Sequence, residues 1–195
     1  MLCATSPNKK MKAEVKVLLA IADGTEEIEA ITALDLLRRA GAEVTVAAAQ
    51  KSVTLSHGLL VTAEKTLEEA AKENYDLIVL PGGLPGAYNL RDDQFLDTLL
   101  RRQVEAKKLV GAICAAPAFI LAEKGFLKNF SATCYPGCEE GYSEVNWQTD
   151  SPVVCDRNFI TGRGPGAAYP FALALIEALY GKETKQRLAR DTMYL

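Results

Sequence analysis

The sequence predicts a single α/β domain in which a doubly wound, mostly parallel sheet carries helices on both faces. Apolar runs of strand length alternate along the chain with stretches of helical periodicity. The first two apolar runs are joined by one helix, and such a crossover makes the neighbouring strands parallel. The 195 residues, of which 49% are hydrophobic, are sufficient for one substantial core.

The first strand is predicted at residues 15–22, which are apolar except for one lysine. The segment D-G-T-E-E-I-E follows, and either Asp23 or Thr25 can cap a helix whose first turn is acidic. This helix ends at Gly41. Apolar side chains at helical spacing are expected to face the core: Ile28, Ile31, Leu34 and Leu37.

A second strand is predicted at residues 43–49 and completes the first strand–helix–strand unit. Within residues 50–65, two short apolar runs flank the turn S-H-G, which indicates a small antiparallel excursion. Thr66 then caps a short helix, because Glu69 three residues later completes a capping box.

The next buried strand, at residues 76–80, runs into the turn P-G-G-L-P-G, whose glycines permit a close approach of the backbone. Either Asp92 or Asp93 caps a helix that reaches about residue 106. Another strand buried on both faces is predicted at residues 109–113.

Cys114 lies where this strand passes directly into a helix predicted at residues 115–125. A tight junction of this kind often holds its residue in a sparsely populated backbone conformation. The positive end of the following helix is expected to lower the pKa of the thiol, and the thiolate is the reactive form. The alternative is that Cys114 is a small buried apolar residue without a chemical role.

The remaining chain is predicted to add short strands and two helices, with a second tight turn, R-G-P-G, between them. No repeat or linker interrupts the chain, so residues 14–195 are expected to form one domain after a flexible N-terminal extension at residues 1–13. The predicted strands are residues 130–135, 153–155 and 159–161, and the helices are an alanine-rich one that ends at Tyr180 and a polar one at residues 182–190.

Composition argues against several classes of partner. The net charge is −3 and no basic block occurs, which argues against nucleic acid. No apolar run has transmembrane length and the N-terminus lacks a signal-peptide core, so a cytoplasmic protein without a membrane partner is expected. Cys134 and Cys138 are close in sequence, but zinc takes three or four nitrogen or sulfur ligands and the single histidine is His57. Neither a metal nor another cofactor is therefore predicted.

Three segments follow predicted parallel strands and should meet at one edge of the sheet: residues 23–29, residues 81–86 and Cys114. In the functional interpretation, the backbone N–H groups of Gly83 and Ala115 form an oxyanion hole there. In the structural interpretation, the glycine-rich segment is a turn that needs positive φ.

Glu29 is the candidate acid/base. It stands between Ile28 and Ala30 at the edge of the packed helix face, whereas Glu26 and Glu27 are expected to be solvated. Burial and a neighbouring thiolate would raise the pKa of Glu29. When protonated it would donate a hydrogen bond to the sulfur, and when deprotonated it could move substrate protons.

The motifs D-G-T-E-E-I-E, L-P-G-G-x-x-G, A-I-C-A-A-P and R-G-P-G occur in this order within residues 15–190. With them the chain resembles the ThiJ/PfpI superfamily and, within it, the Parkinson disease protein deglycase branch. The resemblance implies a flavodoxin-like fold and a homodimer. It implies that Cys114 is the nucleophile, Glu29 its carboxyl partner, and the amides of Gly83 and Ala115 the oxyanion hole. Further residues are expected to line the site: Gly82, Tyr135, Pro136 and Arg163.

The chain departs from this pattern at two positions. Several relatives carry a histidine near the cysteine where this chain has Tyr135, and the protease branch has one directly after the cysteine, where Ala115 stands. A Cys-His-Asp triad is therefore not expected. His57 is either a plain turn residue or, from a position near the dimer interface, enters the partner's site. Arg163 either pairs with an acidic residue, orients the junction at Cys114, or begins a helix.

The preferred functional hypothesis is a cofactor-independent cysteine enzyme that acts on small reactive 2-oxoaldehydes or their adducts, of the glyoxalase or protein deglycase type. Cys114 would attack the aldehyde and Glu29 would move protons. A second hypothesis is a redox-sensing, cytoprotective or chaperone-like protein that uses the same oxidisable thiol. A third is a peptidase or amidase, which would need a histidine from another subunit.

Overall fold

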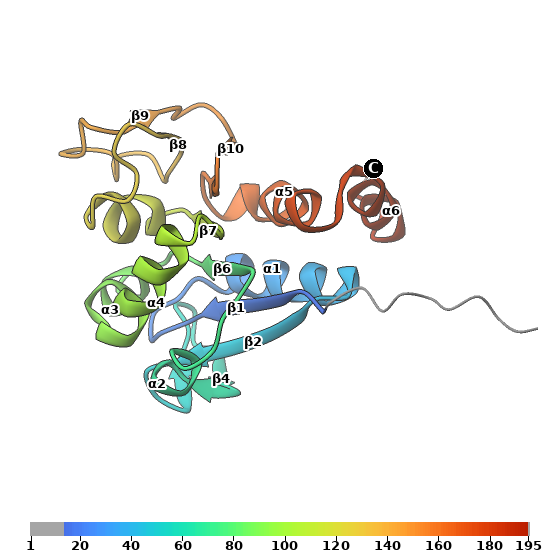
Figure 1. Cartoon of the computed structure of the whole chain (residues 1–195), viewed down its shortest axis with the longest axis horizontal. Helices are drawn as coiled ribbons and strands as arrows, with labels where there is room; N and C mark the ends of the chain where they lie inside the picture. Colours follow the sequence, from blue (N-terminus) through green and yellow to red (C-terminus); the bar gives the residue numbers. More distant parts are fainter. Residues whose placement is uncertain (1–13, 195) are drawn as a thin grey trace, which may run out of the picture.

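A seven-stranded sheet lies at the centre of the computed structural model, which describes residues 14–194 (Figure 1). In sheet order its strands are β10 (Val153–Asp156), β11 (Phe159–Gly162), β7 (Leu109–Ile113), β6 (Leu77–Leu80), β1 (Lys16–Ala20), β2 (Glu43–Ala48) and β5 (Lys65–Thr66). Neighbouring strands are parallel except β10 and β11, which are antiparallel. The predicted extension at residues 1–13 lies outside the described residues, as does residue 195.

Helices cover both faces of the sheet, so the predicted α/β class is confirmed (Figure 1). On one face, α1 (Glu27–Ala40) packs against α5 (Ala168–Tyr180), and α6 (Lys182–Asp191) contacts both. On the other face, α4 (Gln94–Glu105) contacts α2 (Leu67–Ala70) and α3 (Gly86–Asp92). The central strands are buried by both layers, and Val17 to Ala20 of β1 are almost completely shielded from solvent. No helix among residues 14–194 is long and apolar enough to cross a membrane.

Several local predictions are confirmed. The excursion at residues 50–65 is an antiparallel hairpin of β3 (Ser52–Thr54) and β4 (Leu60–Thr62). Thr66 and Glu69 form the capping box of α2, and Asp93 caps α4 by accepting hydrogen bonds from two backbone N–H groups. The helix α3 was not predicted, and it begins at Gly86, the last residue of the glycine-rich turn.

The cap of α1 is a correction. Glu26, not Asp23 or Thr25, caps this helix, because its carboxylate accepts the backbone N–H of Glu29 at 2.9 Å. The Thr25 hydroxyl instead accepts the N–H of Ala22, and Asp23 accepts that of Thr54. The two expected capping residues therefore hold the loop before the helix.

The buried face of α1 also differs from the prediction. Ile28 and Ile31 are 55% and 41% exposed, and Leu34 is half-buried. Small side chains allow a helix to lie close to its neighbours, so α1 turns its alanines inward and brings Glu29 to the edge of the sheet. The residues that it buries are Glu29, Ala30, Ala33, Leu36 and Leu37.

The segment after β7 is not the α-helix predicted at residues 115–125. It forms a π-helix (Pro117–Ala122), in which bonds such as Glu123 N–H to Ala118 C=O span five residues. The proline removes one backbone donor from its first turn. The strand predicted at residues 130–135 is shortened to β8 (Ser131–Ala132), which pairs with the unpredicted β9 (Asn146–Trp147).

Candidate functional site

Cys114 occupies the end of β7 in a left-handed backbone conformation with φ of 65°. This conformation is uncommon for a residue with a side chain, as the sequence predicted for the junction. Its N–H donates to the carbonyl of Gly162 and its carbonyl accepts the N–H of Tyr135, both at 2.9 Å. The residue is 8% exposed. Two neighbouring segments therefore fix the backbone from which the thiol projects.

The glycine-rich turn after β6 lies directly against Cys114. A Cβ added to Gly82 would stand 2.7 Å from the Cys114 Cβ and 2.9 Å from the Ala115 nitrogen. Gly83 has φ of 86°, and a Cβ there would overlap the carbonyl oxygen of Gly24. Both glycines are therefore required for the turn to approach the thiol and the loop before α1.

Glu29 is 1% exposed and reaches the same place from the first turn of α1. Its Oε2 accepts the Gly82 N–H at 2.7 Å, while its Oε1 is buried without a nitrogen or oxygen partner among the described residues. The carboxyl interacts with the Cys114 thiol. Three segments that are distant in sequence therefore meet at the carboxyl ends of β1, β6 and β7.

Burial raises the pKa of Glu29 to about 7, although the Gly82 N–H opposes this shift. Burial and the adjacent Glu29 carboxylate also raise the pKa of the Cys114 thiol, while the N–H groups of Gly83 and Ala115 lower it by hydrogen-bonding the sulfur. The expectation that the positive end of the following helix lowers the pKa of this thiol below that of a free thiol is therefore wrong. When Glu29 is protonated, its negative charge disappears and no longer raises the pKa of the Cys114 thiol. The ionisation of the thiol is therefore coupled to the protonation of Glu29.

The chemical capacity of this arrangement follows from its groups. A sulfur nucleophile stands beside a carboxyl whose pKa lies near neutrality, which suits proton transfer in either direction. The amides of Gly83 and Ala115 already point at the sulfur, so they also lie near an oxygen bonded to a carbon that the sulfur attacks.

Three of the residues predicted to line the site lie together at the same edge of the sheet. Tyr135, Pro136 and Arg163 line one cavity of about 370 Å³. The cavity adjoins the backbone of Cys114, because Tyr135 bonds the Cys114 carbonyl and Arg163 follows Gly162, which bonds the Cys114 N–H. The wall also contains Gly164, Pro165 and Gly166, which belong to the R-G-P-G motif but were not predicted as site residues. It further contains Pro152 and Ala167, for which no local pattern gave a signal.

His57 does not join the thiol site within this chain. It lies in the β3–β4 turn with its side chain 77% exposed, and its Nδ1 is 3.0 Å from the Oε2 of Glu27. Its backbone N–H donates to Oε1 of Glu27, and the Ser56 hydroxyl donates to Oε2. The hydrogen bond to Glu27 raises the pKa of His57. Although burial opposes it, hydrogen bonding by His57 and Ser56 lowers the pKa of Glu27 to about 2.

Glu26 and Glu27 are therefore not the solvated carboxylates that the sequence predicted. Glu26 is buried as the cap of α1, and Glu27 ties this helix to the hairpin. Ligand atoms of Glu26, Glu27 and His57 lie within 4.8 Å of one another, the one such grouping within residues 14–194. Cys134 and Cys138 do not belong to it, and the Cys134 thiol faces Glu139 at 3.8 Å.

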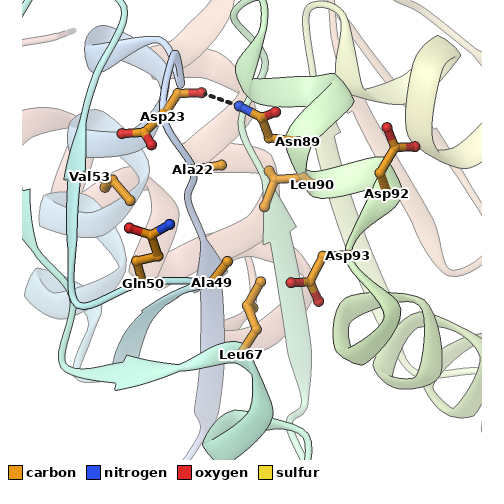
Figure 2. Close-up of a pocket in the computed structure, with 10 residues that line it drawn as sticks. All are labelled: Ala22, Asp23, Ala49, Gln50, Val53, Leu67, Asn89, Leu90, Asp92 and Asp93. Atoms are coloured by element: carbon orange, nitrogen blue, oxygen red, sulfur yellow. Dashed lines mark hydrogen bonds between the residues drawn. The ribbon is translucent and has the colours of Figure 1, made fainter.

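Another cavity, of about 360 Å³, is lined in part by Ala22 and Asp23 of the loop before α1 (Figure 2). Its polar side chains come from three segments, and the Asn89 amide donates to the carbonyl of Asp23 at 2.9 Å. It contains no member of the thiol site, and Asn89 belongs to the helix that the sequence analysis missed. The residues that line it are Ala22, Asp23, Ala49, Gln50, Val53, Leu67, Asn89, Leu90, Asp92 and Asp93.

Comparison with known proteins identifies the relatives of this chain. The model of the DJ-1/PfpI family matches residues 15–178. Protein DJ-1 homolog B of Arabidopsis thaliana is 42% identical over 180 residues, which cover 91% of this chain and 41% of that protein. This chain thus spans less than half the length of that relative. Glutathione-independent glyoxalase DJR-1.2 of Caenorhabditis elegans is 33% identical and covers 89% of this chain and 93% of that protein. The solved structure of oxidized Toxoplasma gondii DJ-1 has a TM-score of 0.86 and 39% identity, and covers 92% of this chain and 98% of that one.

Proposed function

This chain belongs to the DJ-1/PfpI family, and we propose that it is a cofactor-independent cysteine enzyme that converts 2-oxoaldehydes into 2-hydroxy acids. The observation that carries the proposal is the buried Glu29 carboxyl, with a pKa of about 7, beside the Cys114 thiol. A relative of similar length is named a glyoxalase, which supports the substrate class. Because Cys114 itself supplies the thiol, the proposed reaction needs no free thiol as a second substrate.

For methylglyoxal the steps balance without an external oxidant. The Cys114 sulfur adds to the aldehyde carbon while its proton passes to Glu29, and the amides of Gly83 and Ala115 stabilise the resulting oxyanion. Glu29 passes this proton to the oxyanion, which gives a hemithioacetal, and then moves the proton of the aldehyde carbon through an enediol to the ketone carbon. The aldehyde carbon is thereby oxidised to a thioester and the ketone carbon reduced to an alcohol. Water hydrolyses the thioester, which releases lactate and the thiol.

The deglycase form of this proposal uses the same groups on an early adduct between the aldehyde and an amine. The adduct releases the amine and the same hydroxy acid. Product analysis tests both forms. Nuclear magnetic resonance of methylglyoxal incubated with the protein alone, without added thiol, should show lactate, and the Cys114→Ser variant should give none. Lactate formation that survives this substitution would contradict the proposal.

One observation favours a second candidate function, redox sensing with a protective or chaperone-like role. The amides at the sulfur and a protonated Glu29 can all donate hydrogen bonds to a sulfinate on Cys114. The Toxoplasma relative was solved in a form described as oxidized. Peroxide titration followed by mass spectrometry should modify Cys114 first. Oxidation spread equally over all the cysteines would contradict this second role.

The exposed apolar face of α1 supports a homodimer. Ile28 and Ile31 are exposed on this helix, and Leu59 and Leu60 are exposed on the neighbouring hairpin, which Glu27 holds in place. A second copy of the chain would cover these side chains and could place the partner's His57 near this thiol site. Sedimentation should give a dimer for the natural chain and a monomer for Ile31→Glu, and a monomeric natural chain would refute the proposal.

A peptidase would need such a histidine, because the thiol site itself contains none. His57→Ala should then abolish peptide cleavage, and we rank this activity below the others.

The described cysteines, Cys114, Cys134, Cys138 and Cys155, are free thiols. This state supports the cytoplasm as the compartment.

A further inference from the structure

Arg163 differs from the other half-buried cations of residues 14–194. Its guanidinium makes no hydrogen bond or ion pair with any described residue, and its side chain lies partly inside the protein. Of the three alternatives for Arg163, pairing with an acidic residue is therefore not found within residues 14–194. The other half-buried cations each have a carboxylate partner, in the pairs Lys65–Glu73, Arg91–Asp92, Lys108–Asp76, Lys124–Asp97 and Lys185–Glu177.

The cavity beside Arg163 is suited to an anion with a short hydrocarbon chain. No carboxylate is among the described residues that line it, so nothing in its wall neutralises the guanidinium. The wall is otherwise built by three prolines, small residues and the ring of Tyr135. Gly164 leaves room for this ring, since a Cβ there would stand 3.2 Å from it. A cation in apolar surroundings attracts an anion more strongly than one in water.

Both polar walls of the cavity are tied to the reactive residue. Tyr135 donates its N–H to the Cys114 carbonyl, and Arg163 directly follows Gly162, whose carbonyl accepts the Cys114 N–H. These backbone bonds place the cavity next to the residue whose thiol would react with a substrate carbonyl. The planar guanidinium matches the two oxygens of a carboxylate. One cation without a second beside it suits a monoanion better than a phosphate dianion.

We propose that Arg163 is a specificity-determining residue that binds a carboxylate on the substrate, so that preferred substrates are 2-oxoaldehydes with an acidic tail. The inference rests on the proposed function of the Cys114 site. For 4,5-dioxopentanoate the reaction adds one water and gives 2-hydroxyglutarate. As with methylglyoxal, the aldehyde carbon is oxidised and the ketone carbon reduced, with no other reactant.

The test compares 4,5-dioxopentanoate with its methyl ester, which has the same chain but no charge. The natural protein should show a kcat/KM about tenfold higher for the acid, in line with a charge-assisted hydrogen bond. Arg163→Met should bring this ratio close to one, and Arg163→Lys should keep part of it. Arg190→Met, which removes an exposed cation without a partner among the described residues, should leave the ratio unchanged. An equal ratio in the natural protein and Arg163→Met would overturn the inference.

Two further measurements separate this inference from the proposed function. Methylglyoxal has no anionic group, so its turnover by the natural protein and by Arg190→Met tests the thiol site without the contact at Arg163, and absence of turnover in both would refute the proposed function alone. Glutarate has the same acidic tail but no reactive carbonyl. Calorimetry should show that Arg163→Met binds glutarate about tenfold more weakly, while Arg190→Met does not. Equal affinity in all three proteins would overturn the inference whether or not the site is catalytic.

Discussion

The backbone N–H of Gly82 donates a 2.7 Å hydrogen bond to the carboxyl of Glu29, across 53 residues of sequence. This bond joins the end of β6 to the first turn of α1 beside the Cys114 thiol. It occupies one carboxyl oxygen and leaves the other buried near the sulfur. The proton of Glu29 is consequently linked to the charge of the thiol.

The first prediction concerns the ionisation of this pair. The rate at which iodoacetamide alkylates Cys114 should rise with pH through a midpoint near 7, because there the pair loses its first proton. In Glu29→Gln this ionisation is removed and the buried thiol must ionise alone, so the midpoint should move to higher pH. Mass spectrometry of the Cys114 peptide measures the rate. An unchanged midpoint in Glu29→Gln would show that the carboxyl and thiol are not coupled.

The second prediction concerns stability. The pKa of Glu29 is about 7 in the folded protein, above its ordinary value of 4.5, so the folded state binds more protons between these two values. The free energy of unfolding therefore falls as pH rises through this window and is constant above it. The Glu29→Gln variant has no carboxyl at this position, so its free energy of unfolding does not fall for this reason as pH rises. Its stability relative to the natural protein should increase from pH 4.5 to pH 7.5 by at most about 3 kcal/mol. Denaturant unfolding at both pH values measures the change, and a difference that does not vary with pH would contradict it.

The third prediction concerns the close approach of Gly82 to the thiol. Gly82→Ala places a methyl group against the Cys114 Cβ and the Ala115 nitrogen, so it should destabilise the fold by about 1–3 kcal/mol and displace the oxyanion amides. Thermal unfolding and alkylation of Cys114 detect the two effects. Gly166→Ala is the stability control, because open space surrounds that position. Equal melting temperatures for the two variants would contradict this account of the turn.

The fourth prediction uses the single histidine of the chain, whose proton resonances need no assignment. His57 has a raised pKa because it hydrogen-bonds Glu27. Glu27→Gln should therefore lower the pKa of His57 in a nuclear magnetic resonance titration. Glu140→Gln, an exposed carboxyl elsewhere, serves as the control. Identical titration curves in both variants would mean that this contact does not persist in solution.

The position of the thiol site could be predicted because it depends on topology. Parallel strands end at one edge, so the segments after β1, β6 and β7 had to meet there. Which face of α1 is buried could not be predicted. Ile28 and Ile31 recur at helical spacing on one face, and Ala30 and Ala33 recur at helical spacing on another. Hydrophobicity favours the isoleucines, but the space beside the sheet admits the alanines.

The unpaired state of Arg163 also has no local signal. Whether a cation finds a carboxylate depends on segments that only the folded chain brings near it. Likewise, the pKa of Cys114 depends on the burial of the thiol and on a proton held by Glu29. A sequence motif shows neither the burial of the thiol nor the protonation of Glu29. The convergence of Cys114, Glu29 and the glycine-rich turn was thus predictable from the sequence, while the electrostatic state of these groups required the structure.

The central claim is that Cys114 and Glu29 act together on a 2-oxoaldehyde. Steady-state consumption of methylglyoxal by the natural protein, Cys114→Ser and Glu29→Gln at pH 7 tests it most directly. We predict that Cys114→Ser loses all protein-dependent turnover and that Glu29→Gln loses at least about 100-fold in kcat, as expected when a general acid–base group is removed. Turnover by Cys114→Ser at the rate of the natural protein would contradict the claim.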